Sequence, residues 1–464
     1  MVGPTRTSKR WLALACGVSA LLGASHAAAA NSWALVYSEV NNGNAVMSIS
    51  ALNATTAWAV GISTQGSSQS PAGWRTTNGV GWAPMALPAG GGGAMEFTIP
   101  TQIAFLDDNT GWLSGIRVSP ATGQLNLIWR TTSGGMSWDQ LHQAPDEIKH
   151  LQVTHDWAMF AVGGTTVVRT LDGVTFVETQ PSLPSGMGLV GVHMFNKDCG
   201  YALAAPTEES ALGHAVLWTS DGGATWTTRS ENREYRLERA WFVSASQGWA
   251  VGSRGLEGVL AKTTDGGKTW TTSKAPNHPP FMNQEPPVTS CEDVRFFDDR
   301  RGIALCLCCT GDCEGEEGSK PSYMTAFLRT SDGGQTWTMD PDYEAKMSAP
   351  PFPEMSKVSG MFTMSFPDPN NGFMAGQNNL ILRYTADSPE ADAWAPPECS
   401  SGTSGSGGGS SSSGGSSGNE AAEDGGEDAG CGCRVVRSSS PCAPLALLLL
   451  GAGIAHRRRR TRPS

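Results

Sequence analysis

The stretch Thr-Ser-Asp-Gly-Gly-Ala-Thr-Trp, residues Thr219–Trp226, decides the fold of this chain because it recurs along the sequence. Other copies, two intact and the rest degraded, lie at Thr263–Trp270, Thr330–Trp337, Thr131–Trp138, Thr76–Trp82 and Thr170–Phe176, with a looser one from Thr385 to Trp394. We call each copy a box. An arginine or a lysine precedes five of the six clearer boxes. A period of about 40–65 residues predicts a repeat architecture.

The residues of the box are those of a hairpin turn. The glycines accept positive φ, and the carboxylate accepts hydrogen bonds from turn amides. The closing tryptophan buries an aromatic face against the neighbouring sheet. Asn78 and Ser133 replace the aspartate in two degraded boxes, and neither side chain can substitute for a catalytic carboxylate. We therefore predict structural rather than catalytic roles for the box residues Asp172, Asp221, Asp265, Asp332, Trp138, Trp226, Trp270 and Trp337.

A second element precedes each box by about 20–35 residues. It is a short strand of small and apolar residues that ends in glycine, as in Gly111–Gly115, Trp157–Gly163 and Gly248–Gly252. Another strand, which ends in an acidic turn, lies before most copies. Each unit thus offers four short strands, and seven such units predict an all-β chain with a single seven-bladed propeller over residues 31–398. Asn31–Tyr37 is similar to the end of a box plus its return strand, so we expect it to complete the last blade.

The boxes resemble the Asp-box (BNR) repeats of sialidases, sortilin-type receptors, xyloglucan-cleaving hydrolases and photosystem II assembly factors. The pairing of Gly248–Gly252 with a basic residue and the box at Thr263–Trp270 is most similar to the single seven-bladed propellers of the assembly factors. The resemblance covers roughly residues 33–395 and implies the fold. It implies less about function, because propellers host unrelated activities.

The amino terminus, residues 1–30, has the pattern of a secretory signal peptide. A basic start is followed by an apolar run, and small residues end the segment at Ala30, where we expect cleavage. A lipoprotein site at Cys16 is the alternative. Either signal places the rest of the chain outside the cytoplasm.

The carboxyl terminus divides into two parts. Residues 399–430 are rich in serine and glycine and then acidic, which predicts a disordered stalk. Residues 431–464 hold Cys431 and Cys433, a short hydrophobic segment that we expect to be helical, and an arginine cluster. This order resembles the Myxo-type (MYXO-CTERM) sorting signals of myxobacterial surface proteins. The resemblance implies that a membrane protease cuts near Cys431 or Cys433 and leaves the propeller tethered at the cell surface, and an ordinary single-span anchor is the alternative.

The charge of the chain bears on its partners. The region between the signal peptide and Cys433 holds 22 of the 32 basic residues and all 43 acidic ones, a net charge of about −21. Such a surface disfavours nucleic acid and anionic lipid, since few cations are available to neutralise phosphate. Four arginines between positions 233 and 254 are a local exception, which either bind an acidic ligand or belong to a solvated strand face.

Cysteine usage is the least ordinary chemistry of the chain. In an exported protein the default for clustered cysteines is disulfide bonding. A closed zinc or copper site is the alternative for the run Cys306–Cys313, which we interpret as part of an insertion because the spacing between boxes reaches 67 residues there. The histidines form no metal-binding motif, and we expect neither a metal nor another cofactor. The disulfide candidates are Cys291, Cys306, Cys308, Cys309 and Cys313.

Three functions remain open at this point. The first is a non-catalytic cell-surface propeller that binds a protein or a glycan. The second is a glycoside hydrolase of the sialidase or xyloglucanase type, although the chain has six tyrosines, no Arg-Ile-Pro segment and only one propeller. The third is an assembly factor like those of photosystem II. Besides its ligand, the chain should meet a sorting protease at the membrane.

Overall fold

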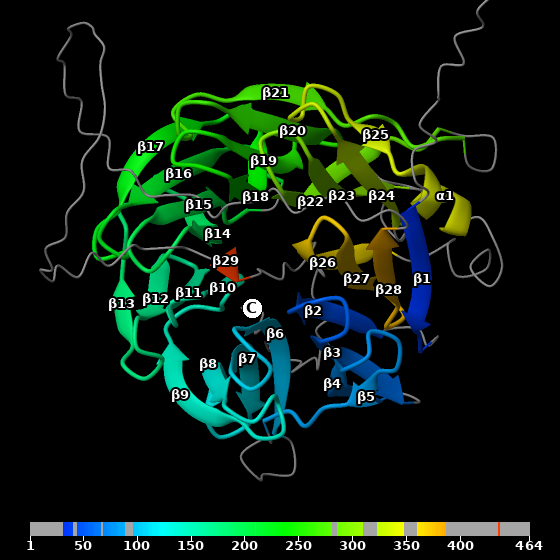
Figure 1. The fold of residues 1–464 in the computed structure, drawn as a ribbon. Helices are drawn as coiled ribbons and strands as arrows, with labels where there is room; N and C mark the ends of the chain where they lie inside the picture. The colour runs from blue at the N-terminus through cyan, green and yellow to red at the C-terminus, as the bar shows by residue number, and fades with distance from the viewer. Residues whose placement is uncertain are drawn as a thin grey trace, which may run out of the picture.

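Seven antiparallel sheets lie around a common axis in the computed structural model of the chain (Figure 1). The structure describes residues 31–39, 44–65, 68–88, 96–208, 210–280, 285–309, 323–347, 360–386 and 435–436. Six sheets have four strands, and the seventh carries a fifth strand of two residues. The predicted all-β, seven-bladed propeller is confirmed.

The first strand of each blade lies nearest the axis, and the fourth lies at the rim (Figure 1). The strands of blade 1 are β2 (Ala45–Ala51), β3 (Ala57–Gln65), β4 (Ser68–Thr76) and β5 (Ala83–Pro84). The strands of blade 2 are β6 (Phe97–Phe105), β7 (Gly111–Ser119), β8 (Gly123–Thr131) and β9 (Asp139–Ala144). The strands of blade 3 are β10 (His150–Thr154), β11 (Met159–Gly163), β12 (Thr166–Thr170) and β13 (Val177–Thr179), and β29 (Val435–Val436) pairs with β10.

Blades 4 to 6 repeat the same order. The strands of blade 4 are β14 (Met187–Met194), β15 (Gly200–Pro206), β16 (His214–Thr219) and β17 (Thr227–Asn232). The strands of blade 5 are β18 (Arg236–Phe242), β19 (Gly248–Ser253), β20 (Gly258–Thr263) and β21 (Thr271–Lys274). The strands of blade 6 are β22 (Val288–Phe296), β23 (Gly302–Cys309), β24 (Tyr323–Thr330) and β25 (Thr338–Met339), after which comes the helix α1 (Pro341–Met347).

Blade 7 joins the two ends of the propeller. It consists of β26 (Met361–Asp368), β27 (Asn371–Gly376), β28 (Ile381–Ala386) and the amino-terminal strand β1 (Asn31–Tyr37). In β1, Trp33 lies opposite Tyr384 and is almost fully buried between the rings of Phe327 and Tyr343, at centroid distances of 5.1 and 5.7 Å. The predicted closure of the ring by the amino-terminal strand is confirmed.

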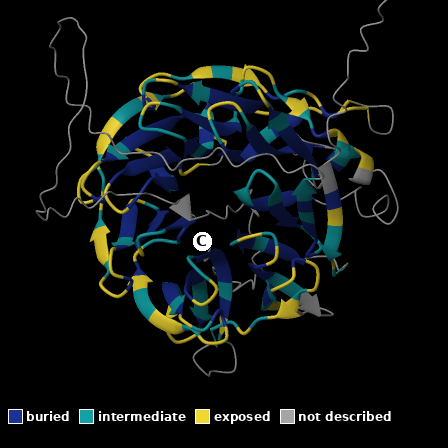
Figure 2. Cartoon of the chain, viewed as in Figure 1, coloured by how far each residue is buried: buried dark blue, intermediate teal, exposed yellow. Residues whose placement is uncertain are grey.

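The core consists of the interfaces between adjacent blades, where apolar side chains of neighbouring sheets pack face to face. Figure 2 shows buried residues through the body of the ring and exposed ones mainly along its rim. No helix in the described ranges is long and apolar enough to cross a bilayer.

Glycines of the second strands lie opposite a β-bulge in the first strand rather than at the strand end that the sequence predicted. A β-bulge shifts the register of the first strand against the second, as between Val46 and Ser48 in blade 1. This brings a backbone carbonyl so close that a Cβ atom at Gly61 would lie 2.0 Å from the oxygen of Ala45. Gly252 meets the oxygen of Arg236 in the same way, at 2.1 Å. Only glycine fits there without moving the strand.

Candidate functional site

The intact boxes form closed turns in which the carboxylate is the central acceptor. Asp332 accepts hydrogen bonds from the hydroxyl of Thr330, from the amides of Gln335 and Thr336, and from the hydroxyl of Thr336, at 2.5 to 2.9 Å for these closest contacts. The bond from the Thr336 hydroxyl is the largest cause that lowers the pKa of Asp332 to about 2. Gly333 has a φ of 73°, which glycine adopts without strain.

The other boxes repeat this geometry with different side chains. Asp265 and Asp221 accept the same threonine hydroxyls and amides in blades 5 and 4. In the degraded boxes, Asn78 accepts two turn amides through its carbonyl oxygen, and the hydroxyl of Ser133 accepts the amide of Ser137 at 3.0 Å. Asp172 accepts the amides of the two residues that follow Gly173. In the four boxes with an aspartate, the oxygen atoms are directed at their own turn.

The arginine before each box of blades 1 to 3 reaches into the next blade. Arg75 in blade 1 donates to the carbonyl oxygen of Asp108 in blade 2 at 3.4 Å, and Arg130 in blade 2 donates to that of Gly173 in blade 3 at 3.2 Å. Arg169 bonds the oxygen of Gly222 in blade 4 in the same way. The guanidinium of Arg75 also lies 5.1 Å from the ring of Trp58. These cations therefore join neighbouring blades, a role that the local sequence pattern did not predict.

Three blade interfaces contain the same aromatic arrangement. Trp249 of blade 5 stacks on Phe296 of blade 6 at 3.5 Å, and the box residue Trp337 meets the edge of that phenylalanine at 5.7 Å. The indole nitrogen of Trp249 donates to the oxygen of Gly333 at 2.9 Å. The other two sets are Trp58 with Phe105 and Trp138, and Tyr201 with Phe242 and Trp270. Trp226 packs against the cluster between blades 3 and 4.

Polar side chains of the inner strands form hydrogen bonds with the backbone of the next blade rather than pointing into an open central channel. The hydroxyl of Ser48 accepts the amide of Ile103 at 3.1 Å, and Gln152 exchanges two hydrogen bonds with the backbone of Met194. His193 bonds the oxygen of Phe242 at 3.0 Å. Burial lowers the pKa of His193 to about 3, so this histidine is neutral and donates through Nε2.

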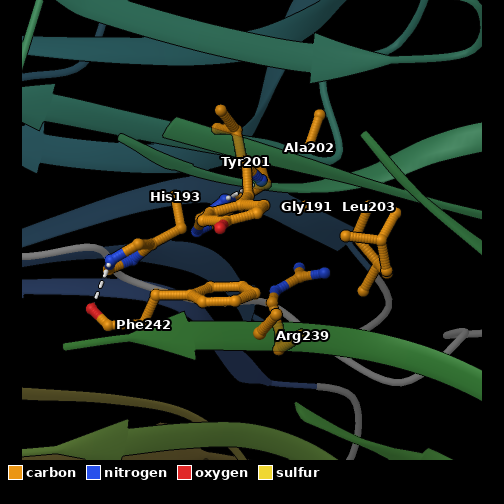
Figure 3. A pocket seen from close by; sticks show the side chains of 11 residues that line it. Gly191, His193, Tyr201, Ala202, Leu203, Arg239 and Phe242 are labelled. Atoms are coloured by element: carbon orange, nitrogen blue, oxygen red, sulfur yellow. Dashed lines mark hydrogen bonds between the residues drawn. The ribbon is translucent and has the colours of Figure 1, made fainter. Parts of the chain in front are cut away.

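A small cavity lies beside this histidine, between blades 4 and 5. Figure 3 shows the parallel rings of Tyr201 and Phe242 in its wall, with Arg239 next to them. Its volume is about 10 Å³, on the order of one water molecule. Arg239 donates to the oxygens of Val190 and Lys149, so its guanidinium is bound within the wall. This space is too small for a substrate.

A buried carboxyl group with a raised pKa lies outside that cavity. Glu292 on β22 accepts the hydroxyl of Ser290 at 2.7 Å. Burial, and after it the charge of Glu238, raises the pKa of Glu292 to about 7. A pKa near 7 suits a general acid or base. Glu292 does not line the cavity, however, and its neighbour Glu238 is already paired with Arg236. Of the four arginines noted in the sequence, Arg239 is buried, and it lies in the ring rather than on a solvated face.

Three cysteines of blade 6 lie in a strand, whereas the sequence predicted that they belong to an insertion. Cys306, Cys308 and Cys309 belong to strand β23 and not to an insertion, because their side chains continue the buried faces of that strand. Cys291 and Cys306 are opposite each other across β22 and β23 and form a disulfide. Cys199 in blade 4 and Cys309 in blade 6 each take part in a disulfide as well. Cys308, one of the disulfide candidates, is a free and buried thiol, and burial raises its pKa to about 12.

Several predicted residues lie outside the described ranges: Ala30, Cys313, Cys431 and Cys433. Among the residues that the structure does describe, no group of three or more histidine, cysteine or acidic side chains is arranged to hold a metal ion.

Sequence reasoning missed a set of exposed apolar side chains. Val80, Met136, Leu171 and Val174 lie in the box turns of blades 1 to 3, and the side chain of Met136 is 74% exposed. Trp157 is 45% exposed and has a φ of 70°, a value rare for so large a residue. The sequence placed Trp157 in the second strand, but β11 begins at Met159, and Trp157 lies in the hairpin before it. We call these five side chains the apolar turn surface.

Comparison with known proteins supports the fold. No protein-family model matches the chain, and no curated protein does. The chain is similar to the structure of YCF48 bound to D1 peptide, with a TM-score of 0.51 and 17% identity, over 78% of this chain and 99% of that one. YCF48 from Cyanidioschyzon merolae gives a TM-score of 0.49 and 18% identity over 77% and 99%. Zg3597, a family 117 glycoside hydrolase from the marine bacterium Zobellia galactanivorans, gives 0.33 and 11% over 65% and 91%. At such identities the first likeness concerns the fold alone, and the other two carry no argument.

Proposed function

We propose that this chain is a non-catalytic binding propeller with a protein as its partner. The apolar turn surface carries this proposal, because turns of three adjacent blades expose large apolar side chains, and exposed apolar patches mark sites of protein interaction. The box carboxylates serve their own turns, which leaves them poorly placed to act on a substrate. YCF48, which shares the fold, has been seen with a bound peptide. We also propose that the boxes are Asp-box (BNR) repeats.

The place where the protein acts is a further part of the proposal. The basic and apolar start that ends at Ala30 supports export by a signal peptide, and the order of Cys431, Cys433, apolar segment and arginine cluster supports sorting to the cell surface. Mass spectrometry of surface-exposed protein from the native host tests both points. We expect a mature chain that begins at Asn31 and lacks the arginine cluster. An intact carboxyl terminus on surface-exposed protein would favour a plain membrane anchor.

Selection of ligands tests the function itself. The full-length chain should be presented with a displayed library of random peptides and, in parallel, with a glycan array. We expect peptides to be enriched and glycans to remain uncut. Glycan hydrolysis by the purified chain, abolished by a single carboxylate substitution that leaves stability unchanged, would show a glycoside hydrolase instead.

A further inference from the structure

We propose that the apolar turn surface docks a protein segment in which lysine or arginine alternates with apolar side chains. This inference rests on the proposed function and adds to it the place of docking and the chemistry of the partner.

The turns that carry the side chains of this surface belong to three adjacent blades and are linked by contacts that run from blade to blade. Arg75 ties blade 1 to the β6–β7 hairpin of blade 2, and Arg130 ties blade 2 to the box turn of blade 3. The amide of Gly134 donates to the oxygen of Asn109 at 2.8 Å, which joins a box turn to the hairpin of its own blade. The turns that carry Val80, Met136 and Val174 therefore follow one another as a linked arc over blades 1 to 3.

The arc is confined to one side of the ring. Val80 and Val174 occur in the two shortened boxes, where they follow Gly79 and Gly173, and Met136 follows the second glycine of its box. In the intact boxes of blades 4, 5 and 6, the residues that follow the second glycine are Ala224, Lys268 and Gln335. The box turn thus carries large apolar side chains in blades 1 to 3 and small or polar side chains in blades 4 to 6. A structural need of the turn would not produce this difference.

Trp157 adds an independent sign of function. Its backbone lies in the left-handed region, which is strained for a residue other than glycine. The hairpin is fixed from both sides, because Asp156 accepts the hydroxyl of Thr154 and, at 3.0 Å, the amide of Lys197 in blade 4. The strained turn holds a half-exposed indole on the face that carries the box turns, where a glycine would relieve the strain.

Charge selects the partner. Carboxylates lie exposed among the apolar tips, at Asp108, Asp139 and Asp172. Hydrogen bonds from turn amides hold the pKa of Asp172 below its ordinary value, so this group is ionised at neutral pH. The nearby guanidinium of Arg130 lies over the ring of Trp112 and donates to a backbone oxygen, which directs it into the ring. A segment with both cations and apolar side chains matches this alternation, whereas an anionic bilayer meets repulsion.

The test uses synthetic peptides as probes against the full-length chain. A labelled peptide of about 12 residues that alternates lysine and leucine is compared by fluorescence anisotropy with glutamate–leucine and lysine–serine peptides of equal length. We expect only the lysine–leucine peptide to bind. The variant V80S/M136S/V174S should lower its affinity by about tenfold or more, and the matched control A224S/K268S/Q335S should bind like the natural chain. D108N/D139N should weaken binding and reduce its dependence on salt.

The outcomes separate the two proposals. Unchanged thermal unfolding of the triple variant shows that lost binding is not lost folding, since all three side chains are exposed. Equal binding of the glutamate–leucine peptide, or full affinity in V80S/M136S/V174S, would overturn this inference. Binding to phosphatidylcholine vesicles that V80S/M136S/V174S weakens would also overturn it, because a bilayer would then be the occupant of the surface. If a selected peptide binds V80S/M136S/V174S as tightly as the natural chain, the proposed docking surface is wrong, while the proposed binding function still holds.

Discussion

Replacing Asp332 with alanine removes the acceptor around which its turn is closed. The carboxylate takes hydrogen bonds from Thr330, Gln335 and Thr336, the last through both its amide and its hydroxyl. A typical net value is about 0.5–1.5 kcal/mol for each bond. The turn is at the surface, so water replaces the lost partners and salt screens the charge. We therefore expect the free energy of unfolding to fall by about 0.5–2 kcal/mol.

The degraded boxes supply matched controls for this change. Because Ser133 and Asn78 still accept turn amides, Asp332→Ser and Asp332→Asn should each retain part of the stability that Asp332→Ala loses. The pKa of Asp332 is about 2 in the folded chain and 3.8 ordinarily. The contribution of the carboxylate is therefore complete above pH 3.8 and disappears as the pH falls through about 2.

Denaturation followed by tryptophan fluorescence measures the series at pH 7 and at about pH 2.5. The difference between natural chain and Asp332→Ala should shrink at the lower pH. Equal stability of the two proteins at pH 7 would refute the structural interpretation of the box. So would loss of a measured binding or activity in Asp332→Ala while its stability is unchanged.

Three further outcomes follow from the contacts described. His278 bonds Glu344 through Nε2 at 3.1 Å and the oxygen of Pro279 through Nδ1; burial lowers its pKa, but Glu344 outweighs burial and leaves it above 6.5. The stabilisation should therefore be complete below pH 6.5 and be lost as the pH rises through the raised value, so denaturation of the natural chain and of His278→Gln should differ most in mild acid. Trp249→Ala should cost about 3–5 kcal/mol of unfolding free energy, since it empties the interface between blades 5 and 6, and denaturant titration would show it. Cys308 should resist alkylation by iodoacetamide in the native protein and react once it is unfolded, and rapid labelling of native protein would contradict its burial.

The propeller was predictable because its signals are local. Asp-Gly-Gly followed by tryptophan determines a turn within eight residues, and seven repeats of such a turn determine the ring. The closing strand was also predictable, because Trp33 stands where a box tryptophan stands in the other units. Local signals thus carried the fold, including the connection between the two ends of the propeller.

The parts that sequence reasoning missed depend on residues far apart in the chain. The partner of Arg75 is 33 positions away, and nothing near Arg75 indicates a contact with Asp108. The cysteines of β23 were interpreted as an insertion from spacing alone, although their side chains face the buried sides of a strand. Trp157 was assigned to a strand because its neighbours are apolar, while its left-handed turn is set by contacts with blade 4. The apolar turn surface becomes visible only when three distant turns are placed side by side.

Hydrogen–deuterium exchange with a bound peptide tests the central claim most directly, which is that this propeller binds a protein partner without catalysis. The complex should be formed with a peptide obtained by selection, and exchange should be followed turn by turn. We expect protection at the box turns of blades 1 to 3 and at the hairpin around Trp157, none at the box turns of blades 4 to 6, and an unaltered peptide mass. Protection confined to the boxes of blades 4 to 6, or a peptide cleaved by the chain, would contradict the account.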